Sequence, residues 1–94
     1  MEDSVVWTEP AAQALDEIIG YIAEHDPAAA DRTIIRIVNQ TAGLSYFPHL
    51  GRAGRIRGTR ELFIDRTQYI VIYRVRERIE VLERDELKRN HRFP

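Results

Sequence analysis

Residues 51–64 read GRAGRIRGTRELFI, an arginine- and glycine-rich stretch that runs directly into a strand-like segment. Its first ten residues contain four arginines and three glycines. Arginine carries a planar, permanently charged group that suits phosphates and carboxylates, and glycine lets the backbone come close to a bound partner. The stretch therefore predicts a shaped basic loop beside a β-sheet, with an anionic partner.

Three β-prone runs separated by short polar turns follow this loop, at residues 61–64, 69–75 and 79–84. Their spacing is typical of an antiparallel meander. Tyr69 and Tyr73 alternate in register with valines, which favours a place in the core over a role as base-stacking platforms. Arg74 lies on the other face of the same apolar run, so it needs either a partner carboxylate or a solvent-facing groove.

Upstream of the loop, a short β-prone segment at 5–7 precedes two helical patterns. Thr8 and Pro10 are typical of a helix start, and the apolar spacing predicts that this helix runs to about His25. Asp26 followed by Pro27 ends the first helix and begins a second, which predicts a helical hairpin. The second pattern fades before Pro48.

The expected fold is α+β: a β-strand, a helical hairpin, and a three-stranded antiparallel meander that completes a curved sheet. Ninety-four residues fit one domain, 1–94, in which residues 85–94 form a polar tail with a capped helical turn expected from Asp85.

The net charge of −1 is the sum of an acidic first half and a basic second half of the chain. Residues 1–50 contain eight acidic side chains and two arginines, whereas residues 51–94 contain twelve basic and seven acidic side chains. There is no cysteine, no long apolar run and no secretory pattern at the start, so we expect a cytoplasmic protein without a membrane partner.

The motifs of several site types are missing from the sequence. His25, His49 and His91 are scattered and lack the spacing of a metal site, and neither a P-loop nor a dinucleotide fingerprint is present. We therefore expect no metal and no cofactor. Glu61 beside Arg60 is a candidate general base with a charge-stabilising neighbour, although such pairs are more often surface ion pairs.

Five segments together resemble the RelE/ParE family of toxins from bacterial type II toxin-antitoxin systems. They span nearly the whole chain and read VVWTEPAAQALDEI at 5–18, Asp26-Pro27, YFPHLGRAGRIRGTRELFI at 46–64, YIVIYRV at 69–75 and IEVLER at 79–84. The resemblance implies that the first strand pairs within the sheet, and that a cognate antitoxin wraps the toxin with its carboxyl-terminal segment and neutralises it. An acidic antitoxin segment would suit the arginine-rich half.

Function divides within this family. RelE-like members cut messenger RNA on the ribosome without a metal, and ParE-like members poison DNA gyrase. This chain departs from the nuclease pattern, because Ile70 stands where RelE-like chains carry an arginine and the basic loop has no lysine. After the last strand, the sequence at 83–87 replaces the family's histidine, glycine and arginines, which makes His91 and Arg92 candidates for displaced counterparts.

The leading hypothesis is a ParE-like toxin of the plasmid stabilisation type, which inhibits growth through DNA gyrase. Its target-binding residues are expected to be Arg52, Arg55, Arg57, Arg60, Arg74 and Arg92. The alternative is a metal-independent mRNA endoribonuclease in which Arg60 and Arg74 clamp the phosphate while Glu61 and His91 move protons. A third reading, motivated by the altered tail, is a detoxified relative that persists as a partner-binding module.

Overall fold

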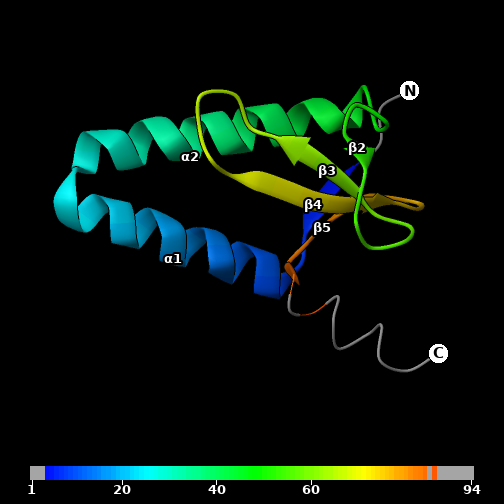
Figure 1. The fold of residues 1–94 in the computed structure, drawn as a ribbon, viewed down its shortest axis with the longest axis horizontal. Helices are drawn as coiled ribbons and strands as arrows, with labels where there is room; N and C mark the ends of the chain where they lie inside the picture. The colour runs from blue at the N-terminus through cyan, green and yellow to red at the C-terminus, as the bar shows by residue number, and fades with distance from the viewer. Residues whose placement is uncertain (1–3, 85, 87–94) are drawn as a thin grey trace.

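The computed structural model describes residues 4–84 and 86. Strand β1 (Val5–Trp7) leads into helices α1 (Glu9–His25) and α2 (Pro27–Ala42), and α2 continues into a short 3-10 turn, η1 (Gly43–Ser45). The remaining strands are β2 (Arg52–Ala53), β3 (Arg60–Phe63), β4 (Ile70–Val75) and β5 (Ile79–Leu82). The two helices lie side by side as an antiparallel hairpin next to the sheet (Figure 1).

Polar caps set the limits of the hairpin, as predicted. The Thr8 hydroxyl accepts a hydrogen bond from the Ala11 amide at 3.3 Å, with Pro10 in the first turn of α1. The Asp26 carboxylate accepts one from the Ala29 amide at 3.0 Å and so begins α2 with only Asp26 between the two helices. The expected strand, helical hairpin and meander are all confirmed.

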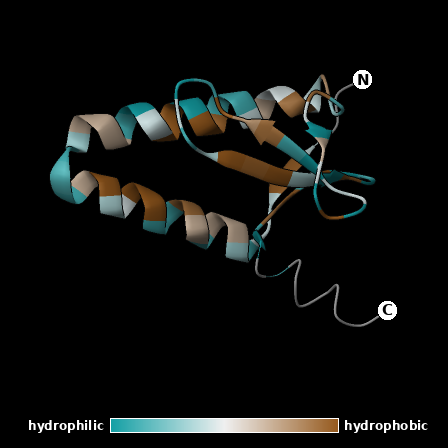
Figure 2. Ribbon diagram, viewed as in Figure 1, coloured by the Kyte–Doolittle hydropathy of each residue, from teal (hydrophilic) through white to brown (hydrophobic). Residues whose placement is uncertain are grey.

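The five strands form one mixed sheet in the order β1-β5-β4-β3-β2. β1 runs parallel to β5, and the other neighbouring pairs are antiparallel. β4 is therefore the central strand, which agrees with its apolar character on both faces, and it is hydrophobic along most of its length (Figure 2).

One prediction about the sheet was wrong. Arg52 and Ala53 were assigned to the basic loop, yet they form strand β2 and pair with Glu61 and Arg60 of β3. The pairing is closed by a hydrogen bond from the Gly54 amide to the Thr59 carbonyl at 2.8 Å. A two-residue strand with both side chains exposed shows no hydrophobic alternation that the sequence could reveal.

The core lies between the hairpin and one face of the sheet. Helical residues Ala11, Ile37 and Leu44 pack there against buried side chains of the strands: Leu62, Val71, Tyr73, Ile79 and Val81. Tyr73 is fully buried and Tyr69 packs against the cluster, so the predicted core role of both tyrosines is confirmed. No helix in the described part of the chain is long and apolar enough to cross a membrane.

The Tyr73 hydroxyl fastens the chain between η1 and β2 to the sheet. It donates to the Pro48 carbonyl at 2.8 Å and accepts from the Gly51 amide at 2.9 Å. A Cβ atom at Gly51 would lie 2.8 Å from the Tyr73 ring and 2.9 Å from the Glu61 carbonyl oxygen, closer than packed atoms allow. Glycine is therefore required here by close approach.

We expect Gly51→Ala to lower the free energy of unfolding by about 1–3 kcal/mol, because the added methyl must displace Tyr73 or the β3 backbone. The control is Gly20→Ala in the middle of α1, where a Cβ would meet no atom within 4 Å. That change should raise stability by up to about 1 kcal/mol. Urea unfolding of both variants checks the pair, and equal stability of Gly51→Ala and wild type would contradict the close approach.

Candidate functional site

Arg60 holds the segment of chain that leads into β2. As the first residue of β3, it shares the core-facing side of that strand with Leu62, because alternate residues of a strand face the same way. Its Nη1 atom donates to the Gly51 carbonyl at 2.7 Å and to the His49 carbonyl at 3.3 Å. The structure thus places this predicted phosphate-binding residue in contact with the backbone of its own chain.

Glu61 lies on the opposite, open face of the sheet and is 7% exposed. Its Oε2 atom accepts from the Arg55 amide at 3.1 Å, and its Oε1 atom is 3.5 Å from Arg52 Nη2. The suggested pairing of Glu61 with Arg60 is therefore wrong, because successive strand residues point to opposite faces. The carboxylate instead holds the start of the loop between β2 and β3, residues 54–59, which we call the arginine-glycine loop.

The same contacts tune the acidity of this carboxyl group. The hydrogen bond from the Arg55 amide is the main cause that holds the Glu61 pKa below its ordinary value, and the charges of Arg55 and Arg52 act in the same direction. Burial opposes them by favouring the neutral acid. A carboxylate with a lowered pKa is a weaker general base.

Two more arginines of the open face are engaged. Arg52 has a side chain that is 60% exposed, and its guanidinium lies 4.4 Å from the centre of the Phe63 ring, which is a cation–π contact. Arg74 pairs with Glu80 across β4 and β5 through an Nε–Oε1 contact of 2.5 Å. Of the two possibilities that the sequence left open for Arg74, the partner carboxylate is the one present, and this contact holds the Glu80 pKa below its usual range.

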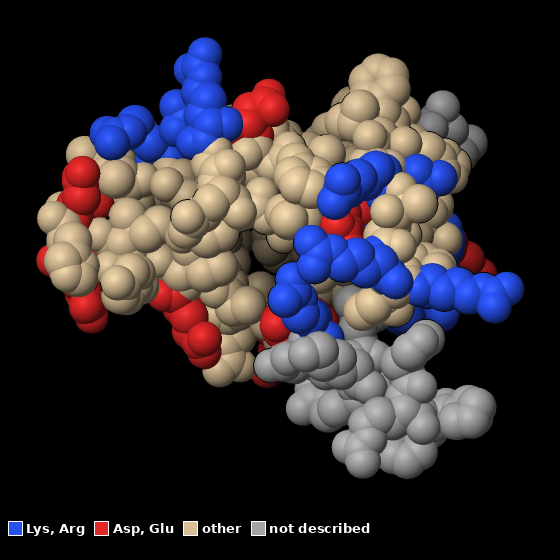
Figure 3. All heavy atoms as spheres, in the orientation of Figure 1, with Lys and Arg blue, Asp and Glu red and all other residues tan. Residues whose placement is uncertain are grey.

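The exposed cations gather where the arginine-glycine loop and the β4–β5 turn emerge from the sheet. We call Arg55, Arg57, Arg76 and Arg78 the basic end; all four are exposed. The strand register brings their two segments together, since Arg60 at the start of β3 pairs with Tyr73 near the end of β4. Figure 3 shows basic side chains crowded over this end of the molecule.

Sequence reasoning missed half of the basic end. Arg76 and Arg78 were read only as residues of a polar turn, although the predicted meander already places that turn beside the segment that enters β3. The signal was available in the strand order. The expected target-binding set thus divides: Arg55 and Arg57 lie at the basic end, whereas Arg52, Arg60 and Arg74 have partners within the chain.

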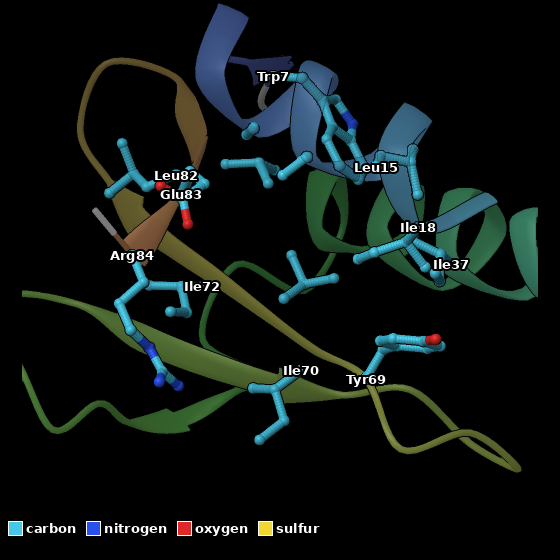
Figure 4. Close-up of a pocket in the computed structure, with 14 residues that line it drawn as sticks. Trp7, Leu15, Ile18, Ile37, Tyr69, Ile70, Ile72, Leu82, Glu83 and Arg84 are labelled. Carbon is cyan, nitrogen blue, oxygen red and sulfur yellow. The ribbon is translucent and has the colours of Figure 1, made fainter. Parts of the chain in front are cut away.

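An apolar groove of about 200 Å³ separates α1 from the start of β4 and the end of β5. Most of its lining is hydrophobic and comes from both layers, including Trp7, Leu15, Ile18, Ile37, Tyr69, Ile70 and Leu82. Figure 4 shows Arg84 extending beside Ile72 at its rim. Arg84 also lines a neighbouring cavity of about 220 Å³ together with Arg55 and Glu61, so it connects the groove with the arginine-glycine loop.

Comparison with known proteins identifies this arrangement. Residues 5–83 match the family model of the ParE toxin of the type II toxin-antitoxin system, parDE. This chain belongs to the ParE toxin family. A protein of Sinorhizobium fredii (strain NBRC 101917 / NGR234) named "Putative toxin Y4kP" is 43% identical over 76 residues, which is 81% of this chain and 79% of that protein.

A solved structure supports the same family. The chain is similar to one in a structure entitled "Chromosomal ParDE TA system from P. aeruginosa", with a TM-score of 0.79 and 28% identity. The match covers 87% of this chain and 92% of that one. The protein is therefore a ParE-type toxin of a type II toxin-antitoxin system, and its α+β fold is that of this family.

The remaining candidates of this ParE-family toxin fall in two groups. His91, Arg92 and Asp85, the residue at which a helical turn is expected to begin, lie outside the described residues. His25 and His49 are exposed and lie in separate elements, at the end of α1 and before β2. Within residues 4–84 and 86, no three histidine, aspartate or glutamate side chains come together as a metal site would require.

Glu61→Gln should lower the free energy of unfolding of this ParE-family toxin near pH 7 by about 1 kcal/mol, because it removes the charge that holds the Arg55 amide and Arg52. The pKa of Glu61 is lowered in the folded state. The stability that the ionised carboxylate contributes is therefore present above the pKa of the unfolded chain, about 4.3, and is lost as the pH falls. The difference in stability between wild type and variant should therefore shrink progressively as the pH falls below the unfolded-state pKa.

Urea unfolding at stepped pH measures this gap. Glu24→Gln, which removes an exposed charge from α1, is the matched control and should stay within a few tenths of a kcal/mol of wild type. A Glu61→Gln gap that stays constant or widens on acidification would show that the loop does not depend on the charged carboxylate.

Proposed function

We propose that this ParE-family toxin inhibits DNA gyrase and that a cognate antitoxin neutralises it. The observation that carries the choice of target is the engagement of the nuclease candidates. Arg60 is bonded to the carbonyls of Gly51 and His49, Arg74 to Glu80, and the lowered pKa of Glu61 makes it a weak base. Membership in the ParE family favours the same target.

A purified toxin of this kind should stop gyrase from supercoiling relaxed plasmid and should cause cleaved plasmid to accumulate. Agarose gels of reactions with rising toxin concentration measure both effects, and addition of the antitoxin encoded beside the toxin gene is the control that should restore supercoiling. Complete supercoiling at saturating toxin would refute the gyrase target.

The outcome of that assay also separates the rival functions. If gyrase is unaffected and induction of the toxin in cells creates new 5′ ends in ribosome-bound messenger RNA, the endoribonuclease hypothesis is correct. If neither effect occurs and overexpression without the antitoxin is harmless, the chain is a detoxified binding module.

The apolar groove between α1 and β4 supports the antitoxin half of the proposal. The description of the matching family pairs toxin and antitoxin, and an extended or helical antitoxin segment needs apolar pockets for its anchoring side chains. The groove offers half-buried Ile18 and Ile70 as walls, with Arg84 at the rim. An antitoxin segment with apolar residues flanked by carboxylates fits this surface.

Ile18→Ala/Ile70→Ala should weaken the complex with the antitoxin at least about tenfold. The double change truncates two side chains that line the groove, which should cost more than about 1.4 kcal/mol of binding free energy. The control is Ile35→Ala, which trims a side chain that is 57% exposed on α2 and does not line the groove. Isothermal titration calorimetry measures both. A folded double variant with unchanged affinity would place the antitoxin elsewhere.

A further inference from the structure

We propose that the basic end binds the phosphate backbone of duplex DNA. This inference deepens the proposed function and rests on it in one respect: the toxin would hold the DNA on which gyrase acts, in addition to contacting the enzyme. Arg55 and Arg57 project from the arginine-glycine loop, and Arg76 and Arg78 from the β4–β5 turn. All four side chains are exposed, and the strand register places both segments at the same end of the sheet.

Internal hydrogen bonds hold the two segments in shape before any ligand arrives. The Thr59 hydroxyl and amide both donate to the Ile56 carbonyl, at 2.6 Å and 3.1 Å. Gly58 has a φ of 83°, a conformation that favours glycine. In the turn, the Arg76 amide donates to the Arg78 carbonyl at 3.0 Å. A backbone that is already ordered loses less conformational entropy on binding.

Positive charge is concentrated at this end, and negative charge lies along α1. Residues 54–58 and 76–78 contain four arginines and a single acid, Glu77. Helix α1 contains Glu9, Asp16, Glu17 and Glu24 and no lysine or arginine, and acidic side chains line that edge of the molecule (Figure 3). With a net charge of only −1, attraction to a polyanion must come from this local concentration and would orient the toxin as it approaches.

The composition of the basic end favours duplex DNA over other anions. Single strands are held largely by aromatic stacking, and the segments GRIRG and RER contain no aromatic residue. Protein partners need apolar anchors, and the two segments contain only Ile56, which is half-buried. Arginines without stacking or apolar anchors suit contacts to phosphates, which are independent of base sequence.

The test is fluorescence anisotropy of the full chain with a labelled duplex of about 20 base pairs, at salt concentrations from about 50 to 200 mM. Four phosphate contacts predict a slope of log K against log salt of about −3.6, which is a loss of affinity of roughly a hundredfold over this range. A slope near zero, or no binding at the lowest salt, overturns the inference.

Matched variants locate the contact. Arg57→Gln/Arg78→Gln removes one arginine from each segment and should reduce the magnitude of the slope by about 1.8. Arg32→Gln/Arg36→Gln removes the same charge from α2 and should leave the slope unchanged. Equal losses in the two variants would mean that net charge alone governs binding. A single strand of equal length, or a polyglutamate peptide, that binds as tightly as the duplex also overturns the inference.

A gyrase supercoiling assay on the same preparations separates this inference from the proposed function. If the toxin inhibits gyrase but binds no free duplex, and Arg57→Gln/Arg78→Gln inhibits as well as wild type, the DNA contact is refuted and the gyrase target stands. If the duplex binds with the expected slope while supercoiling continues, the gyrase target is refuted and the DNA contact stands.

Discussion

The contact on which the site depends is the one between the buried Tyr73 hydroxyl and the chain that leads into β2. This hydroxyl uses both its donor and its acceptor capacity, on the Pro48 carbonyl and the Gly51 amide. A buried hydroxyl left without partners is costly, so the loop cannot leave Tyr73 without loss of stability. Because Tyr73 lies in the central strand, the position of the loop is tied to the core.

Two consecutive residues of β3 also hold this part of the chain, one from each face of the sheet. Arg60 bonds the carbonyls of Gly51 and His49 on the core side, and Glu61 bonds the Arg55 amide on the open side. Charged hydrogen bonds of this kind are stronger than neutral ones. The residues that the sequence offered as catalytic partners thus build the loop, which leaves the arginines at its tip exposed.

The sequence predicted those features that depend on local chemistry. Thr8 and Asp26 predict helix starts because their side chains can cap a helix, and the alternation of valine and tyrosine around Tyr73 predicts a buried strand. Strand β2 was missed because its existence depends on pairing with β3 rather than on its own two residues.

The site was less predictable than the fold, for the same physical reason. Whether an arginine is exposed or engaged depends on which face of a strand it occupies and on what lies across from it. Arg60 donates hydrogen bonds to backbone carbonyls, and Arg74 pairs with Glu80. Arg76 and Arg78 lie near the arginine-glycine loop only because of the order of the strands. Arginine composition alone indicated an anionic partner without distinguishing these roles.

Arg84 gives the two candidate surfaces a physical connection. It lines the apolar groove proposed for the antitoxin and also the cavity that contains Arg55 and Glu61. An antitoxin carboxylate that pairs with the exposed Arg84 would therefore lie next to the arginine-glycine loop and reduce the positive potential there, since opposite charges within several ångströms offset one another. Occupation of the groove would then oppose binding of an anionic target without covering the whole basic end.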